Sequence, residues 1–318
     1  MKRLSLVALL ISLMASGAFA VTSFNWDPNK AGDWNDPNKW LDGNGNPAGS
    51  TPDGTAQIQI RRSGSQCTLD TSVGEDWADA QRLRVYDEAV LNIVDGGSLL
   101  GVSWLRVGTA DGPAKLNQTG GVIRLKRSSD NSKLHIGDAG GSQGSTYTMS
   151  GGTLTYLDGD GSLWAGYRGG EGKFTVVGTG PKILMRRLYV GGDLAFKAGA
   201  GTIEFKIGSN GVSPIQISDS VYIDRDGEGS KASLLVSATA TPPKADIVLI
   251  EDTSSGRVEG VFETVNGNPA PEGAPVVLSY SGTDYHYKLT YKHDAGGDGN
   301  KNDVALIYVS EPPKSPGN

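Results

Sequence analysis

LRVYDEAVLNIVDGG, residues 83–97, is the first of five similar units in this chain. The others are residues 105–121 (LRVGTADGPAKLNQTGG), 134–152 (LHIGDAGGSQGSTYTMSGG), 163–180 (LWAGYRGGEGKFTVVGTG) and 188–205 (LYVGGDLAFKAGAGTIEF). Each unit restarts at a leucine, and the restarts are 22, 29, 29 and 25 residues apart. Steps of this size are typical of stacked coils, in which one unit cannot bury its apolar face alone.

Apolar and polar residues alternate within each unit, and this alternation predicts short β-strands. Glycines such as Gly120 and Gly121 suit the corners between strands, because tight bends need positive φ or leave no room for a Cβ. Three strands per coil predict an all-β fold, a right-handed parallel β-helix (β-solenoid). An antiparallel sandwich also accommodates Gly-rich turns, but it does not explain the recurring Leu-x-Val-Gly restart.

The segment before the repeats is rich in tryptophan. Residues 24–40 (FNWDPNKAGDWNDPNKW) contain Trp26, Trp34 and Trp40. We expect residues 21–82 to form an N-terminal cap and an irregular first coil, because the open end of a solenoid must be covered. The alternative is that the indole rings form a sugar-binding face.

The repeat weakens after Gly211. The regular coils are therefore assigned to residues 83–241, and a closing β-region of hairpin-type strands is expected over residues 242–309. Residues 310–318 are rich in proline and are expected to be disordered.

The first 20 residues have the pattern of a secretory signal peptide. Lys2 and Arg3 supply the basic start, residues 4–14 the apolar stretch, and residues 18–20 (AFA) a cleavage site. The apolar stretch is too short to span a membrane, and no other part of the chain approaches the required length. We expect a secreted protein, extracellular or at the cell surface, after cleavage near Ala20.

The charge and the cysteine content limit the partners. Without Lys2 and Arg3 the chain has 27 basic and 35 acidic residues, a net charge of −8, which argues against nucleic acid. Cys67 is the only cysteine, so no internal disulfide can form, and we expect a buried, unreactive thiol.

Several motifs recur in one known kind of protein: WNDPNKW at 34–40, LNQTGG at 116–121, YTMSGG at 147–152 and GGDGNKNDVALI at 296–307. With them, the chain resembles the secreted β-helical proteins of planctomycetes and related bacteria. These are similar to proteins with autotransporter-associated β-strand repeats. The resemblance implies an extracellular structural or adhesive role and carries over no catalytic residue.

One row of side chains is the best candidate for ligand contact. The residue after each restart leucine is, in order, Arg84, Arg106, His135, Trp164 and Tyr189. If the leucines point inward, alternation places these five on one outward face, as an exposed stripe about 19 Å long. Arginine pairs with carboxylate or sulfate, and aromatic rings stack on sugars, so the stripe predicts contact with an acidic polysaccharide. The alternative is a structural ladder of rings that stack on one another.

Asp224, Asp226 and Glu228 form the best candidate metal site, because calcium prefers several hard oxygen ligands on a flexible loop. Their spacing does not match an EF-hand, and Asp and Gly are also ordinary turn residues. No cofactor is expected, and calcium is an optional ligand.

No catalytic set is recognisable around His135, His286 and His293, the only histidines. A hydrolase of this fold would need two carboxylates about 5 to 9.5 Å apart, and adjacent coils offer no such pair. We therefore expect a non-catalytic extracellular structural or adhesion protein that contacts a matrix or cell-wall polysaccharide, or a second copy of itself. Two alternatives stay open: a polysaccharide lyase, and a carbohydrate-binding module that uses the tryptophan-rich opening.

Overall fold

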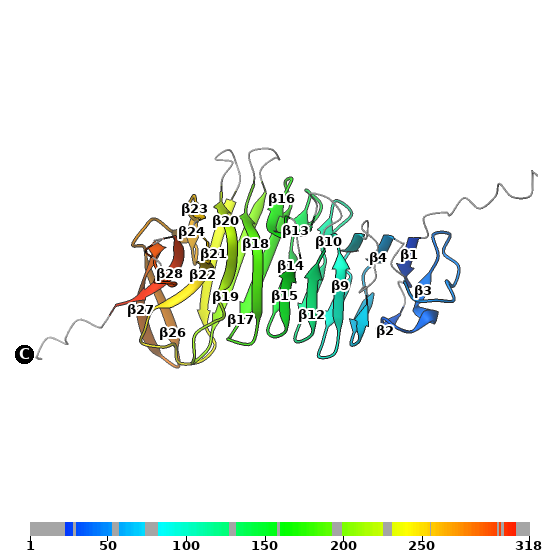
Figure 1. Cartoon of the computed structure of the whole chain (residues 1–318), viewed down its shortest axis with the longest axis horizontal. Coiled ribbons are helices and arrows are strands. Elements are labelled where there is room, and N and C mark those ends of the chain that lie inside the picture. The colour runs from blue at the N-terminus through cyan, green and yellow to red at the C-terminus, as the bar shows by residue number, and fades with distance from the viewer. Residues whose placement is uncertain are drawn as a thin grey trace, which may run out of the picture.

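In the computed structural model, strands of successive coils lie side by side along a rod (Figure 1). The structure describes residues 23–27, 30–52, 57–73, 82–126, 132–157, 160–192, 199–224, 231–254, 256–297, 299 and 302–309. They form a parallel β-solenoid, which confirms the predicted fold class. The expected signal peptide and tail lie outside the described residues.

Three strand positions recur along the rod. The first position contains β1 (Ser23–Trp26), β4 (Gln57–Arg61), β7 (Arg82–Tyr86), β10 (Trp104–Thr109), β13 (Lys133–Asp138), β16 (Ser162–Tyr167) and β23 (Arg257–Glu259). The second contains β2 (Ala31–Asp33), β5 (Gln66–Leu69), β8 (Val90–Ile93), β11 (Lys115–Gln118), β14 (Ser145–Met149), β17 (Glu171–Val177), β19 (Ala200–Ile207), β21 (Lys231–Ala238) and β24 (Thr264–Val265). The third contains β6 (Ser72–Val73), β9 (Ser98–Val102), β12 (Val122–Leu125), β15 (Thr153–Tyr156) and β22 (Ile247–Asp252).

In two later coils the third strand and the next first strand run on as one. These continuous strands are β18 (Lys182–Val190) and β20 (Ile215–Ile223). The N-terminal half of β18 pairs with β15 and its C-terminal half with β16. A register shift between Met185 and Arg187 separates the two halves where β18 pairs with β20.

The restart leucines form one inward file. Leu83, Leu105, Leu134, Leu163 and Leu188 are neighbours in the parallel ladder, and each is fully buried. Ile58 precedes this file and Val221 follows it, in the same register. The predicted stacking of these side chains is therefore confirmed, and this file of the core is aliphatic from Ile58 to Val221.

The parallel ladder is longer than the sequence repeat indicates. Its pairs continue from β1 and β4 at one end to β22, β23 and β24 at the other. The segment expected to be an irregular first coil already pairs in register, and the solenoid continues past residue 241 to Val265. Because inward positions accept Ile, Val or Leu equally well, the coils persist where the leucine pattern fades.

Two positions in the repeat can be occupied only by glycine. Gly121, at a corner, has φ +64°, and a Cβ there would lie 1.9 Å from the carbonyl oxygen of Gly97 in the coil below. Gly166, in a Leu-x-x-Gly restart, has φ +74°, and a Cβ would lie 2.4 Å from the carbonyl oxygen of Ala200. Both positions combine a left-handed backbone with close packing of another strand, so only glycine fits.

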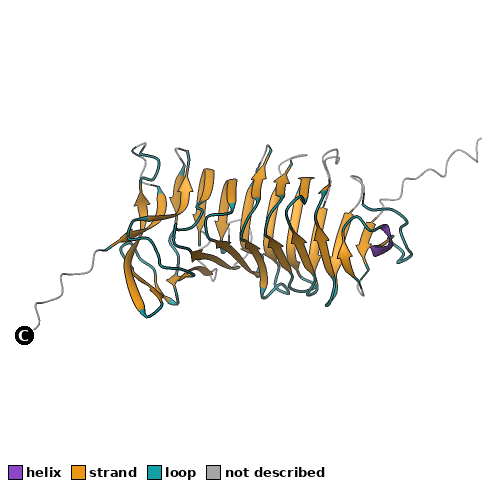
Figure 2. Ribbon diagram, turned by 90° about the horizontal axis from the view of Figure 1, so that it is seen from below, coloured by secondary structure: helices purple, strands orange, loops and turns teal. Residues whose placement is uncertain are grey.

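The tryptophan-rich segment is a cap. Trp26, Trp34 and Trp40 are fully buried, and the ring of Trp40 lies 5.0 Å from that of Trp26 and 4.9 Å from that of Trp34. The indole Nε1 of Trp40 donates to the carbonyl oxygen of Trp34 at 2.7 Å. Figure 2 shows the 3-10 helix η1 (Pro37–Lys39) at this end, before β3 (Trp40–Leu41). The alternative of a tryptophan face for sugars is wrong, since none of these rings reaches solvent.

Antiparallel strands close the other end. β26 (Pro275–Tyr280) pairs with β27 (Thr283–His293), β27 pairs with β28 (Asp303–Tyr308), and β28 returns to β22. The short strand β25 (Asn268–Pro269) folds back onto β24. The closing β-region is thus present, but it begins only after the last parallel strand.

The inward file makes a direct prediction. Replacing Leu163 by Ala leaves a cavity between two neighbouring coils, so we expect the free energy of unfolding to fall by about 2–5 kcal/mol in urea titrations. Leu157→Ala is the matched control, because that side chain is 55% exposed and its loss is expected to change stability by about 0.5 kcal/mol or less. Equal losses from the two variants would contradict a stacked core.

Candidate functional site

Two rows of side chains project outward from the first-position strands. The Arg82 row consists of Arg82, Trp104, Lys133, Ser162, Arg187 and Ser220. The Arg84 row consists of Arg84, Arg106, His135, Trp164, Tyr189 and Tyr222. The second row contains all five candidate ligand residues in the predicted order and on one face, and it continues one coil further to Tyr222.

The sequence predicts that the whole Arg84 row is exposed to solvent, and this prediction is wrong for three of its members. His135 is 1% exposed, Trp164 3% and Tyr189 7%. The rings of Trp164 and Tyr189 stack with centroids 3.7 Å apart and planes 4° apart, and Tyr222 continues the stack at 4.8 Å. These side chains point away from the core column yet bury one another, so this half of the row is the structural ladder that sequence alone left as the alternative.

A bend in each strand adds a second layer over His135. The chain turns at Gly137 and again at Gly166, both with positive φ, so Asp138 and Tyr167 fold back over the row. The ring of Tyr167 lies 4.5 Å from that of His135. His135 Nδ1 lies 3.3 Å from Oδ1 of Asp138, but neither imidazole nitrogen has a partner with hydrogen-bond geometry. Burial lowers the pKa of His135, so the imidazole is neutral near pH 7.

The opposite end of the two rows is cationic. Arg106 lies 3.7 Å and Arg82 5.1 Å from the centre of the Trp104 ring, and Arg84 lies beside Arg106 in the ladder. Asp138 binds Arg106, with Oδ2 and Nε 2.9 Å apart. Burial lowers the pKa of Arg106, and the charges of Arg84 and Arg82 lower it further against the opposing effect of Asp138. Two guanidinium groups thus lie on one indole ring, a third lies beside one of them in the ladder, and one carboxylate pairs with Arg106.

Further along, the charged side chains on the same face form ion pairs. Asp160 lies between Lys133, at 3.8 Å, and Arg187, at 3.0 Å. Asp219 in turn contacts Arg187 at 2.9 Å and Arg186 at 3.1 Å. This chain of alternating charges joins three cations through two carboxylates, so each of its side chains has a partner of opposite charge.

The candidate calcium site is described only in part. Asp224 follows β20 with φ +49° and is half-buried, whereas Asp226 and Glu228 lie outside the described residues. Among the residues that are described, no group of three or more His, Cys, Asp or Glu side chains is placed to hold a metal ion. Calcium binding stays a prediction.

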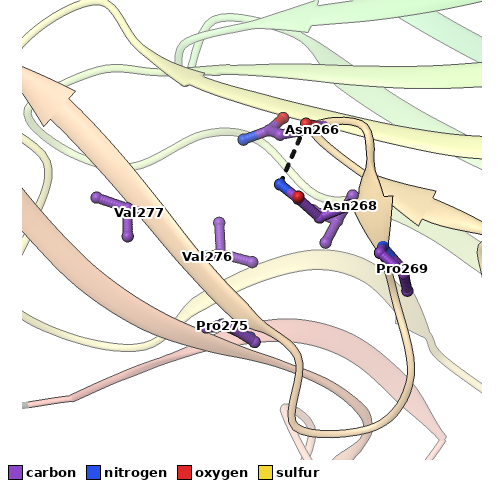
Figure 3. A pocket seen from close by; sticks show the side chains of 7 residues that line it. Asn266, Asn268, Pro269, Pro275, Val276 and Val277 are labelled. Carbon is purple, nitrogen blue, oxygen red and sulfur yellow. Dashed lines mark hydrogen bonds between the residues drawn. The ribbon is translucent and has the colours of Figure 1, made fainter.

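Other hollows of the surface have fewer charged or reactive side chains. One of about 470 Å³ lies between the β24–β25 turn and β26, lined by Asn266, Asn268 and Pro269 on one side and Pro275, Val276 and Val277 on the other (Figure 3). Its lining has amide and apolar groups but no acid, base or nucleophile. A proline in each flanking strand removes a backbone donor, which protects these edges from added strands.

Two open hollows of about 340 and 430 Å³ meet at Gly144 on the second-position strands. Lys115 and Lys173 lie in this shallow groove beside Glu88 and Glu171. Lys173 already forms an ion pair with Glu204 at 3.1 Å. The groove is therefore polar and close to neutral, in contrast to the cationic end of the two rows.

Two buried carboxylates, Asp252 and Asp303, were not predicted from the sequence. Asp303 accepts from the backbone N–H of Asp252 at 2.8 Å and from that of Ala295 at 2.6 Å. Burial raises the pKa values of both Asp252 and Asp303. These bonds tie the closing strands to the last coil, which assigns the pair a structural role.

Sequence reasoning missed Arg82 and Trp104, which precede two of the restart leucines. The signal was present, because alternation places the residues before and after an inward leucine on the same outward face. Asp138 and Tyr167 gave no comparable signal, since only the bend at the preceding glycine brings them over the row.

Comparison with protein-family models, with curated proteins and with solved structures finds no match for this chain. Within the described ranges, no helix is long and apolar enough to cross a membrane. The role of the site must therefore be argued from its own chemistry.

His135 makes a pH prediction. Its pKa in the folded state lies below the ordinary value of 6.5, so below about pH 6.5 the unfolded chain takes up a proton that the folded protein does not. Stability is therefore expected to fall with decreasing pH, by up to about 1.4 kcal/mol per pH unit from this group.

His135→Phe keeps a ring in the stack but removes the titrating group. Urea unfolding of both proteins at pH 7.5 and 5.5 measures the effect, and the loss on acidification is expected to be smaller in the variant. An identical loss would mean that His135 is protonated as easily in the folded protein as in the unfolded chain.

Proposed function

We propose that this chain is an exported, non-catalytic structural or adhesion protein that contacts acidic polysaccharide through the cationic end of the two outward rows. The observation that carries the proposal is the group formed by Arg82 and Arg106 on the Trp104 ring and by Arg84 next to Arg106, on a protein whose net charge is negative. In an acidic protein, a local excess of positive charge favours an anionic ligand at that place.

The shape of the molecule supports the same proposal. Each coil adds a strand about 4.8 Å from the last, so the face extends along the rod and can lie against an extended polymer. Both ends are closed, by the buried tryptophans and by the antiparallel strands, which favours contact along the side over end-to-end stacking of copies. Self-association through the side of the rod is the alternative partner.

The wider setting is part of the proposal. Export through the N-terminal signal peptide would bring the mature chain to the cell surface or the surrounding matrix, where carboxylated and sulfated polysaccharides occur. The likeness in motifs to secreted β-helical proteins of the planctomycete type is consistent with that location. Membership in that group is proposed on the motifs alone.

A titration of the mature protein tests the function. We expect binding to polygalacturonate, alginate and dextran sulfate at low ionic strength, and no binding to neutral dextran. Binding is expected to weaken strongly between 0.01 and 0.5 M NaCl, because the screening length falls from about 30 Å to only a few ångströms over such a range. Isothermal titration calorimetry measures both effects.

The same samples separate this proposal from a lyase. A lyase creates unsaturated sugar ends that absorb ultraviolet light, so absorbance is followed after mixing with polygalacturonate and alginate. Growth of that absorbance would overturn the non-catalytic proposal. Equal affinity for neutral and acidic glycans would overturn the charge-based contact.

A further inference from the structure

Arg82 and Arg84 are two neighbouring cations without a counter-charge among the described residues. They lie two positions apart on β7, so both side chains leave the same side of the strand. No described carboxylate lies within 4.0 Å of either guanidinium group. Arg82 is exposed and Arg84 half-buried, so a group from solvent reaches the pair.

Arg106 and Arg187, on the same face, differ in this respect. Arg187 contacts Asp160 and Asp219, and Arg106 contacts Asp138. All of them project from first-position strands, so they belong to one sheet and leave it on the same side. Arg82 and Arg84 thus lack the carboxylate partner that Arg106 and Arg187 have in later coils of the same sheet.

Hydrogen-bond donors at the same place also lack partners. Nε of Arg84 and Nε1 of Trp104 are buried N–H groups with no acceptor in hydrogen-bond geometry. A buried donor without an acceptor is unfavourable, and a guanidinium group offers its donors in a planar fork that matches an oxyanion. Trp104 also holds Arg106 against its ring, which keeps a third positive charge close to the pair.

We propose that Arg82 and Arg84 form a subsite for one oxyanion, a carboxylate or a sulfate ester carried on a sugar. The two guanidinium groups bind the oxyanion, while Arg106, whose charge is paired with Asp138, packs on the Trp104 ring beside them. This inference deepens the proposed polysaccharide contact and rests on it for the identity of the polymer. The aromatic half of the row, which is buried, contributes order to the sheet and no direct contact.

Small anions test the subsite apart from the polymer. Inorganic sulfate and sodium glucuronate are titrated separately into the mature protein at low ionic strength by isothermal titration calorimetry. Arg82→Gln and Arg84→Gln are each expected to weaken the affinity about tenfold or more, since each removes a charged hydrogen-bond donor. Arg84→Lys keeps the charge without the fork and is expected to lie between wild type and Arg84→Gln.

Arg124→Gln is the matched control. Arg124 is a half-buried arginine on β12 in the same coil as Arg106, but its ladder neighbours are Leu100 and Thr155, neither of which carries a guanidinium group. Its loss removes the same net charge and is expected to leave sulfate and glucuronate binding unchanged. Thermal melting of each variant checks the fold. Because Arg82 is exposed, Arg82→Gln is expected to leave the fold intact.

The outcomes separate the subsite from the function. Unchanged sulfate and glucuronate affinity in both Arg82→Gln and Arg84→Gln overturns the subsite, whatever the polymers do. A subsite that binds small anions in a protein that binds no acidic polysaccharide supports this inference and overturns the proposed function. Preference for sulfate over glucuronate, or the reverse, identifies the group that the polymer carries.

Discussion

The parallel register of the inward file is the constraint on which the rest of this protein depends. Leu83, Leu105, Leu134, Leu163 and Leu188 stack directly, and the backbone hydrogen bonds of the ladder hold each coil to the next. Since side chains alternate along a strand, fixing one inward residue per coil also fixes the outward residues on either side of it. The Arg82 and Arg84 rows are therefore consequences of core packing, and a slip of one residue in any coil would break both.

The same outward face has two different physical characters along its length. Where successive coils offer Trp164, Tyr189 and Tyr222, the rings satisfy one another and exclude water. Where they offer Arg84 and Arg106, two like charges lie side by side, and Asp138 pairs with Arg106. One geometric rule thus yields a rigid aromatic stack at one end and an open, charged surface at the other, about four coils away.

Much of the fold was predictable because each coil of a solenoid repeats the same sequence pattern of inward, outward and corner residues. The leucine restarts indicated the coils, their inward file and the order of the outward row, and the open ends indicated caps. The length of the ladder was underestimated, because Ile58, Val221 and Val258 fill the file without the leucine that marked the repeat. The glycines were correctly placed at bends, but a sequence does not state in which direction a bend carries the residues after it.

The sequence by itself determined the periodicity: which residues face inward, which face outward, and that Arg84, Arg106, His135, Trp164 and Tyr189 share one row. Only the tertiary structure decided which members of that row reach solvent. The physical reason is that alternation defines the direction of a side chain, whereas burial depends on what lies above it. Here that cover comes from Asp138 and Tyr167, which the turns at Gly137 and Gly166 bring back over the row, and from the stacking of rings contributed by separate coils.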